Sequence, residues 1–404
     1  MKLRTMDSIE VSEKIVLLRC DLNVPVSENG EITDTSRIER LLPTVSQLSS
    51  KGAKIALLSH FGRPAGKYDE QFSLNNLSDV IAEVLQADEI TVIPDCIGKV
   101  TRNVLEDLPK GGIALLENVR FYPGEEKNDI AFSKSLSEIA DIYINDAFSV
   151  SHRRHASIDA ITKLLPSYAG RALQFEVEML DKVLKKSNPP VLAIIGGSKV
   201  STKLGLLDNL VEKMETIAIG GGMANTFLAA KNTNIGSSFF EETMINDAKS
   251  IIKKSEKIGC QFLLPVDVVV ANKLESGVKS KIVDIDKVPK NSMILDIGPK
   301  TVELFTGAIV SSKTLLWNGP LGVFEVPPFD QGTSNCALTA AMLSRSGGLI
   351  SVAGGGDTIA ALNNAGASGG FSYVSAAGGA FLEWIEGKIL PGIIALREKE
   401  GERK

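Results

Sequence analysis

The sequence predicts an α/β protein with two doubly wound, Rossmann-like parallel-sheet domains. Short β-rich apolar runs alternate along the chain with longer stretches, most of which could hold a crossover helix. Two such series follow one another, separated by a segment with helical periodicity. The length of 404 residues also fits two or three domains, because domains average roughly 150 residues.

The predicted strands fall into two groups, one in each half of the chain. In the first half they are Ile15–Leu18, Ile55–Leu58, Ile90–Ile93, Ile113–Leu116 and Ile142–Ile144. In the second half they are Val191–Ile195, Ile217–Ile219, Phe262–Leu264, Leu315–Trp317 and Leu349–Val352.

A predicted helix separates these two groups. Its apolar stripe, at spacings of four, three and four, consists of Leu173, Val177, Leu180 and Leu184. The stop at Ser187-Asn188-Pro189-Pro190 ends it. We interpret residues 173–187 as a connector between domains at 1–172 and 188–387, the alternative being a crossover helix inside one large domain. A short amphipathic helix is also predicted from Phe381, ending before Pro391.

The composition excludes several classes of protein. An apolar fraction of 44% and a charged fraction of 23% are inconsistent with a disordered chain, a collagen-like rod or a coiled coil. The net charge of −5 gives the whole chain no electrostatic reason to bind nucleic acid or an anionic membrane. Any anion site must therefore be built by local clustering of basic groups.

The sequence also gives no support for a membrane protein, a secreted protein or a zinc-binding protein. Apolar runs such as Val191–Ile195 are far shorter than the about 20 residues of a membrane-spanning helix. The N-terminal MKLRTMDSIE lacks the apolar core of a signal peptide. Four widely spaced cysteines suit reduced thiols in a cytoplasmic protein. His152 and His155 could offer two metal ligands, but no cysteine lies near them.

Glycine clusters mark a predicted ligand site in the second half. Helix starts are predicted just after Gly222, Gly356 and Gly379. Glycine between a strand and a helix lets a ligand approach backbone N–H groups at the positive helix end. Several such loops in one domain indicate a polyphosphate site, and tight turns without a ligand are the alternative. The clusters are Gly196-Gly197, Gly220-Gly221-Gly222, Gly354-Gly355-Gly356 and Gly378-Gly379.

Two lysines follow the first glycine pair. Lys199 and Lys203 would share one face of a helix that opens directly after the glycines. Cations there oppose the helix dipole, which favours a bound polyanion over two solvated lysines. The spacing is wrong for a P-loop, and no G-x-G-x-x-G follows a strand, which argues against a dehydrogenase. The D-F-G and H-R-D motifs of protein kinases are absent.

Basic residues in the first half gather after predicted strands. Ligands bind at that edge of open α/β sheets, and arginine forks match carboxylate and phosphate groups. A single such arginine is best interpreted as a surface residue. Several of them together predict a site for a small, highly anionic molecule. Asp21 and Asn23 could accept a substrate hydroxyl or simply shape the turn. The basic set is Arg19, Arg37, His60, Arg63, Arg120 and His152-Arg153-Arg154-His155.

A nucleotide-type site in one half and a small-anion site in the other predict phosphoryl transfer with hinge closure. Together these segments resemble the phosphoglycerate kinase family nearly from end to end. No single motif is decisive, but their number and order are specific. They are Arg19–Pro25, His60–Pro64, Leu115–Phe121, Asn145–Phe148, His152-Arg153, Gly196–Val200, Gly220–Ala224, Trp317–Glu325 and Gly354–Thr358.

The resemblance implies a fold and a reaction. The two domains would face each other across a cleft, joined by a helix hinge, with the C-terminal segment 388–404 completing the N-terminal domain. The enzyme would reversibly transfer a phosphoryl group from 1,3-bisphosphoglycerate to Mg·ADP, giving 3-phosphoglycerate and Mg·ATP. The cofactor would be Mg²⁺, the partners small molecules only, and the protein a cytoplasmic monomer.

The resemblance also implies roles for individual residues. The catalytic groups would be Arg37, Lys203, Gly356 and Gly379. Phosphoglycerate would be bound by Asp21, Asn23, Arg37, His60, Arg63, Arg120 and Arg153. The nucleotide would be bound by Lys199, Lys203, Gly221, Gly222, Asn318, Pro320, Val323, Glu325, Gly355, Gly356, Asp357 and Thr358. Glu325 would lie at the ribose, and Asp357 would hold the magnesium.

Physical chemistry agrees with these roles. The group in flight spreads negative charge over three equatorial oxygens, so catalysis is positioning plus charge stabilisation. The attacking carboxylate oxygen of phosphoglycerate is already ionised, so neither a general base nor a covalent intermediate is needed. Domain closure would expel the water that hydrolyses an acyl phosphate.

Three positions depart from the family pattern. Ala376-Ala377 stand where the family usually has Thr-Gly, which predicts a weaker phosphate cradle. Ser149-Val150 replace Gly-Thr, and Arg171 replaces an apolar residue beside the hinge. The rival interpretation is a catalytically silent nucleotide-binding or regulatory protein on the same fold. The presence of Arg37, Lys203 and Asp357 together favours an enzyme.

Overall fold

The protein consists of two compact α/β units. The computed structural model describes residues 2–7, 9–27, 29–185 and 187–398. Unit 1 comprises Met1–Glu178 and Ile389–Lys404, and unit 2 comprises Met179–Lys388. The division falls inside helix α7 (Arg171–Leu184). Residues 399–404 of the segment expected to complete the first domain lie outside the described residues, as do residues 1, 8, 28 and 186 of the predicted domains and connector.

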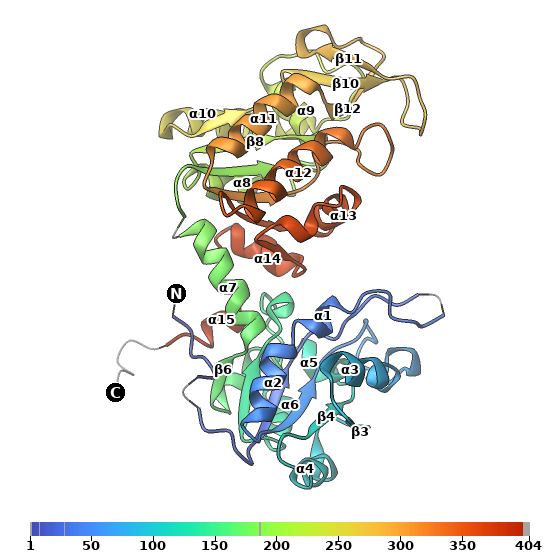
Figure 1. Ribbon diagram of the computed structural model, residues 1–404, viewed down its shortest axis with the longest axis vertical. Coiled ribbons are helices and arrows are strands. Elements are labelled where there is room, and N and C mark those ends of the chain that lie inside the picture. Colours follow the sequence, from blue (N-terminus) through green and yellow to red (C-terminus); the bar gives the residue numbers. More distant parts are fainter. Residues whose placement is uncertain (1, 8, 28, 186, 399–404) are drawn as a thin grey trace. The chain divides into compact units, whose positions relative to one another are not determined.

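Unit 1 is built on a six-stranded parallel sheet in the order β3-β4-β2-β1-β5-β6. Its strands β3, β4 and β6 are labelled in Figure 1. The first strand, β1, is fully buried, and its residues alternate between two cores: Val16 and Leu18 belong to one, Ile15 and Leu17 to the other. Burial on both faces explains the continuous apolar run of its first four residues. The strands are β1 (Ile15–Arg19), β2 (Lys54–Leu58), β3 (Thr91–Ile93), β4 (Ile113–Leu116), β5 (Ile142–Asn145) and β6 (Ser167–Ala169).

Helices cover both faces of this sheet. One core contains apolar residues of α1 (Ser36–Glu39), α2 (Leu42–Ser50) and α3 (Ser78–Leu85). The other contains residues of α4 (Gly98–Glu106) and α6 (Ile130–Ser137), the latter preceded by α5 (Pro123–Glu126). The short helix α15 (Pro391–Ile394) belongs to the same unit, and its Gly392 N–H donates to the Ser151 carbonyl (2.9 Å).

Unit 2 contains a second six-stranded parallel sheet, in the order β15-β14-β13-β7-β8-β9. Unit 2 also contains a separate three-stranded antiparallel sheet in the order β11-β10-β12. The parallel strands are β7 (Val191–Ile195), β8 (Thr216–Ile219), β9 (Gln261–Leu263), β13 (Thr314–Asn318), β14 (Ile350–Gly354) and β15 (Tyr373–Ser375). The antiparallel strands are β10 (Asp267–Ala271), β11 (Lys281–Asp284) and β12 (Met293–Ile297).

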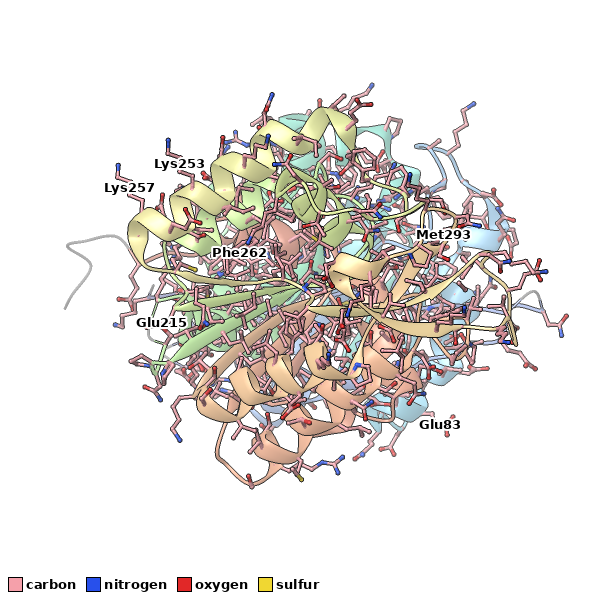
Figure 2. The ribbon with its side chains drawn as sticks, turned by 90° about the horizontal axis from the view of Figure 1, so that it is seen from above. Glu83, Glu215, Lys253, Lys257, Phe262 and Met293 are labelled. Carbon is pink, nitrogen blue, oxygen red and sulfur yellow. The ribbon has the colours of Figure 1, made fainter. Side chains whose placement is uncertain are left out.

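The helices of unit 2 also lie on both faces of its sheet, with α10 on one side and α11 and α12 on the other (Figure 2). Phe262 of β9 packs against Phe227 of α9, with ring centroids 5.1 Å apart, whereas Lys253 and Lys257 of α10 extend outward (Figure 2). The helices are α8 (Leu204–Val211), α9 (Gly221–Ala230), α10 (Ile245–Ile258), α11 (Pro299–Ser311), α12 (Gln331–Arg345), α13 (Gly356–Asn364) and α14 (Gly379–Ile385).

The predicted α/β class with two parallel-sheet domains is confirmed, and each predicted strand is present with ends shifted by at most two residues. The helix starts predicted around Gly222, Gly356 and Gly379 are confirmed as well. The sequence interpretation missed β6 and β15, which are three-residue edge strands too short to show a period. It also missed β10–β12, because an antiparallel insertion interrupts the strand–helix alternation. Within the described residues no helix is long and apolar enough to cross a bilayer.

The start of α7 is fixed by buried polar groups. The Asp146 carboxylate accepts hydrogen bonds from the Leu173 N–H (2.9 Å) and the Thr44 hydroxyl (2.6 Å). The Thr44 oxygen in turn accepts from the Arg171 N–H (2.8 Å). A side chain at Gly170 would place Cβ 2.4 Å from the Asp146 carboxylate, so this close approach requires glycine. The helix therefore begins at Arg171, two residues before the predicted connector, whose end at 187 is also three residues too late.

We expect Asp296 of β12 to make unit 2 less stable as the pH rises. Its buried carboxylate accepts the Ile297 and Gly332 N–H groups (both 2.8 Å), and burial raises its pKa to about 7. The unfolded value is about 3.9, so the folded state favours the neutral acid, and that stabilisation is lost as the pH rises from about 4 to 7. The free energy of unfolding of the Asp296→Asn variant, measured in urea across this pH range, should not show this decrease.

The matched control is Asp284→Asn. Asp284 is bonded to Lys300 and Lys287, which lower its pKa, so its contribution is present above its unfolded pKa and is lost as the pH falls. Asp284→Asn should therefore leave the slope between about pH 4 and 7 as it is in wild type, and should alter the stability only below about pH 4. Identical slopes for wild type and Asp296→Asn would contradict the prediction.

Candidate active site

The strand order of unit 1 reverses between β1 and β5, and in open α/β sheets ligands bind beside the loops that follow such strands at their carboxyl ends. Asp21 follows β1, and Ser149 follows β5. The Ser149 hydroxyl donates to Oδ2 of Asp21 (2.6 Å), so a hydrogen bond crosses this switch point. The same Oδ2 atom accepts from Nη1 of Arg37, also at 2.6 Å. The half-buried Arg37 guanidinium is thus held at this edge of the sheet.

Asn23 connects the same loop to the loop after β2. Its side-chain oxygen accepts from the Gly62 N–H (2.8 Å), and its own N–H donates to Oδ1 of Asp21 (3.2 Å). Both interpretations of Asp21 and Asn23 therefore have a physical basis. They shape the loops, and the carboxylate keeps further acceptor capacity on Oδ1.

Positive charge accumulates beside these two residues. Arg120 donates from Nη1 to the Gly62 carbonyl (2.7 Å) and lies 3.5 Å from Glu126. Burial, together with the charges of Arg19 and Arg153, lowers the pKa of Arg120 to about 10. His60 is buried, and desolvation followed by the surrounding cations lowers its pKa well below the ordinary value. Crowded cations of this kind are stabilised when an anion binds among them.

Two predicted residues are less tightly held. Arg63 is exposed, and within the described ranges no hydrogen bond or ion pair joins it to the others. Arg153 is half-buried, and its Nε donates to Nε2 of His152 (3.4 Å). Both side chains are therefore free of strong internal bonds that a ligand would have to break.

Unit 2 has its own switch point, between β7 and β13. Lys203 bridges it, since its ammonium group donates to the Gly196 carbonyl after β7 and to the Asn318 carbonyl at the end of β13 (3.1 Å). Burial lowers the pKa of Lys203 to about 8, against the opposing effect of the nearby Asp357 carboxylate. A cation therefore sits where open α/β sheets bind their ligands.

The expectation that Lys199 and Lys203 share a helical face is wrong. Helix α8 begins only at Leu204, after an irregular turn. Gly197 has φ +104°, which turns the chain away from helix geometry. Glu241 then holds the turn by accepting the Ser201 N–H (3.0 Å). Lys199 is left exposed, while Lys203 folds back onto Gly196.

Some glycines serve contacts between loops. A Cβ at Gly196 would lie 1.9 Å from the Pro320 carbonyl oxygen, and one at Gly221 would lie 2.7 Å from the Gly197 oxygen. The Gly221 N–H donates to the Leu321 carbonyl (2.8 Å). At Gly196 and Gly221, glycine is therefore explained by tight turns alone, without a ligand. Gly222, by contrast, has an ordinary φ and faces Ser198.

The start of α13 is open to a ligand. Gly356 has no atom within 4 Å of an added Cβ, and it is exposed together with Asp357. The first helical bond of this segment runs from the Ile359 N–H to the Gly355 carbonyl (3.0 Å). The preceding N–H groups, including that of Thr358, lie at the positive end of the helix dipole. Anions are favoured at such an end.

Two buried side chains join this start to β13. The Thr358 hydroxyl accepts from the Gly319 N–H (2.7 Å) and donates to the Gly354 carbonyl (2.8 Å), so it is occupied internally. Asn318 donates to the same carbonyl (2.6 Å), but its buried Oδ1 has no partner among the residues that the structure describes. An unsatisfied buried acceptor is costly, and a donor from a bound ligand would remove that cost.

The remaining predicted residues are spread around this region. Pro320 is buried and its carbonyl accepts the Gly197 N–H (3.0 Å), while the Val323 N–H donates to the Leu295 carbonyl (2.9 Å). Glu325 is exposed. Gly379 begins α14, and in the part of the chain with described positions no hydrogen bond ties it to the other predicted residues.

A magnesium ion fits this site only together with a ligand. Across residues 2–398, apart from the masked positions, no group of three or more His, Cys, Asp and Glu side chains could hold a metal ion alone. Asp357 nonetheless offers an exposed carboxylate at the start of α13. Magnesium is commonly bound by one or two carboxylates plus substrate phosphates. The donor set agrees with that arrangement.

Several residues of the site were not predicted. Ser149 was noted only as a departure, yet its hydroxyl contacts Asp21. Arg19 was included among the basic residues but given no role, although it is fully buried and contacts His60. Glu125 and Ser157 lie behind Arg19. Only the position of Arg19 at a strand end could have revealed it, since nothing in the local sequence marks Glu125 as buried.

Comparisons with known proteins agree on one family. A family model described as phosphoglycerate kinase matches residues 6–388. A phosphoglycerate kinase of Chelativorans sp. is 52% identical over 98% of this chain and 99% of the relative, and one of Sinorhizobium medicae is 50% identical over 99% and 100%. The solved phosphoglycerate kinase of Coxiella burnetii has a TM-score of 0.90 at 38% identity, covering 98% of both chains.

Proposed function

Since the chain belongs to the phosphoglycerate kinase family and is a kinase of that type, we propose how its residues carry out the reaction. The reaction is the reversible, direct in-line transfer of a phosphoryl group from 1,3-bisphosphoglycerate to Mg·ADP, giving 3-phosphoglycerate and Mg·ATP. The observation that carries the assignment of residues is that each unit presents a cation at the switch point of its own parallel sheet, Arg37 in unit 1 and Lys203 in unit 2.

We propose that unit 1 binds the phosphoglycerate. Arg37 is paired with Asp21 and Arg120 with Glu126. Burial and the neighbouring charges of Arg19 and Arg153 still lower the pKa of Arg120, and a small polyanion would compensate this excess of cations. Asp21 and Asn23 are suited to accept from the substrate hydroxyl. The full binding set is Asp21, Asn23, Arg37, His60, Arg63, Arg120 and Arg153.

Unit 2 is proposed to bind the nucleotide. The N–H groups at Gly356, Asp357 and Thr358 and the ammonium groups of Lys199 and Lys203 would meet the phosphates. Asp357 would ligate the magnesium, which neutralises phosphate charge when bound. Residues around the adenosine would be Gly221, Gly222, Asn318, Pro320, Val323 and Glu325, with Gly355 providing the turn into α13.

The transfer step needs charge stabilisation rather than proton transfer. Negative charge on the migrating group would be balanced by Arg37, by Lys203 and by the backbone at Gly356 and Gly379. Because one substrate is bound by each unit, turnover requires hinge closure, in which the two units approach each other. Exclusion of water at that stage protects the acyl phosphate.

The protein is proposed to act as a cytoplasmic monomer on small molecules. Its four cysteines are buried and free, which supports a reducing compartment. A coupled assay of ATP-dependent 3-phosphoglycerate phosphorylation tests the proposal. Turnover clearly above that of an Arg37→Ala control supports it, and turnover equal to that control would leave the silent binding protein as the better interpretation.

Lys203 gives the reaction an expected pH dependence. Its pKa of about 8 means that the charge is present below that pH and is lost as the pH rises through it. We expect kcat/KM for Mg·ADP, which reports the free enzyme, to fall tenfold per unit above about pH 8. Bound phosphates favour the charged lysine, so the fall in kcat should begin at a higher pH.

The matched variant is Lys203→Arg, whose guanidinium stays charged throughout this range. Its overall activity will be lower, but the inflection near pH 8 should disappear. An inflection at the same pH in both proteins would show that another group is responsible.

A further inference from the structure

A row of buried polar side chains lies behind the basic residues of unit 1. It runs from Glu125 through Ser157 and Arg19 to His60. Arg19, Glu125 and Ser157 are each fully buried, and His60 is 4% exposed. The distances are 2.6 Å from Ser157 Oγ to Glu125 Oε1, 2.9 Å from Arg19 Nε to Ser157 Oγ, and 3.2 Å from Arg19 Nη2 to His60 Nδ1. The row therefore ends at a residue proposed to bind phosphoglycerate.

The direction of each hydrogen bond follows from the chemistry of the groups. Serine has a single hydroxyl proton, which Ser157 gives to the Glu125 carboxylate, so its oxygen accepts from Arg19. A guanidinium has donors only. Nδ1 of His60 must therefore accept from Arg19, which requires that this nitrogen carries no proton.

The guanidinium of Arg19 is occupied inside the protein on every nitrogen. Besides the bonds to Ser157 and His60, its Nη1 donates to the Cys20 carbonyl. The Glu125 carboxylate, also bonded by the Ser157 N–H (2.9 Å), provides a compensating charge one hydroxyl away. A buried arginine held in this way is fixed in orientation by its partners within the protein.

The charges around His60 also favour an imidazole ring that carries no positive charge. The groups that face it are the guanidinium groups of Arg19, Arg120 and Arg37 and the imidazole of His155. All of these oppose a proton on His60, as does its burial. The neutral ring then carries its single proton on Nε2, for which no partner is found in the described part of the chain.

We propose that Arg19 is a positioning residue that holds His60 as the neutral Nε2–H tautomer, so that His60 meets the phosphoglycerate as a hydrogen-bond donor only. This inference rests on the proposed function, because it takes His60 to contact the phosphoglycerate. Its consequence is selectivity for an acceptor oxygen at that point of the substrate, with the imidazole plane fixed by the bond at Nδ1.

The test is a long-range ¹H–¹⁵N correlation spectrum of the imidazole rings in the full-length protein. The chain has three histidines, and loss of one set of signals in His60→Gln assigns the resonances of His60. We expect wild-type Nδ1 to keep the shift of an unprotonated nitrogen across the range from about pH 8 to 5 in which histidine normally titrates. A protonated Nδ1 in that range would overturn the proposal without any further variant.

Arg19→Met and Ser157→Ala test the role of the row. In Arg19→Met, Nδ1 should gain a proton within the same range, and KM for 3-phosphoglycerate should rise about tenfold or more, whereas KM for Mg·ATP stays unchanged. Ser157→Ala keeps the charge but frees the guanidinium plane, and it should give a smaller change of the same kind. The control is Arg102→Met, which removes an arginine of α4 that is paired with Glu106 and belongs to no candidate site, and it should alter neither readout.

A final measurement separates this inference from the proposed function. Addition of 3-phosphoglycerate should shift the Nε2 resonance of wild-type His60. If Nε2 does not respond while Nδ1 is unprotonated, then the binding role of His60 fails and the Arg19 bond stands. If the variants leave the Nδ1 protonation and KM unchanged, then Arg19 does not position His60.

Discussion

Replacing Arg37 by alanine will lower kcat by about two to three orders of magnitude, the effect typical of removing a group that stabilises charge in the transition state. Arg37 is half-buried and oriented by the 2.6 Å bond to Asp21, so its guanidinium is already in place before substrate binds. Because the pair is partly exposed, its loss should cost little stability. Steady-state kinetics in both reaction directions measure the effect.

Two variants sharpen this experiment. Arg37→Lys keeps the charge but loses the planar fork, so its kcat should lie between those of wild type and Arg37→Ala. Arg102→Ala, on α4 and outside the candidate site, should behave as wild type. A variant in which KM rises while kcat is preserved would show that Arg37 binds ground state and transition state equally, contrary to the proposed role.

Asp357→Ala should weaken the binding of Mg·ADP by about ten- to a hundredfold while the binding of 3-phosphoglycerate survives. The carboxylate lies exposed in the first turn of α13, within unit 2, and is proposed to ligate the magnesium. Separate calorimetric titrations of the two ligands measure the difference. ADP without magnesium adds a sharper readout, because removing a negative charge beside the phosphates should not weaken its binding.

The cost in stability must be separated from this effect. Loss of an acidic residue from the first turn of a helix is worth about 0.3–1 kcal/mol. Asp247→Ala removes an equivalent residue from the first turn of α10 and serves as the matched control. Equal loss of both ligands in Asp357→Ala would contradict the assignment of the two substrates to separate units.

The sequence predicted the fold to the extent that local pattern determines it. Buried parallel strands such as β1 and β7 are continuous apolar runs, and glycines before α9 and α13 mark the turns from strand to helix. The insertion β10–β12 could not be predicted, because its pairing depends on contacts between segments distant in the sequence. The helix expected directly after Gly197 begins only at Leu204, and the turn before it is bonded to a residue distant in the sequence, Glu241.

The candidate site was predictable at the level of strand ends, where Asp21 and Asn318 stand. The use of each group depends on three-dimensional neighbours. The Thr358 hydroxyl looks available in sequence but is occupied by two backbone groups. In the sequence Ser149 is only a departure from the family pattern, whereas in the structure its hydroxyl donates a hydrogen bond to Asp21. Arg171, the departure beside the hinge, is paired with Asp7 and bonded to Gln47 (2.8 Å) at the start of α7.

The carboxylate that anchors α7 lies close in sequence to the candidate site of unit 1. Asp146 lies three residues before Ser149, whose hydroxyl bonds to Asp21, and its carboxylate accepts from the first turn of α7, the helix in which the division between the two units falls. Three residues of chain therefore separate the Asp21–Ser149 hydrogen bond from the carboxylate that anchors the start of α7.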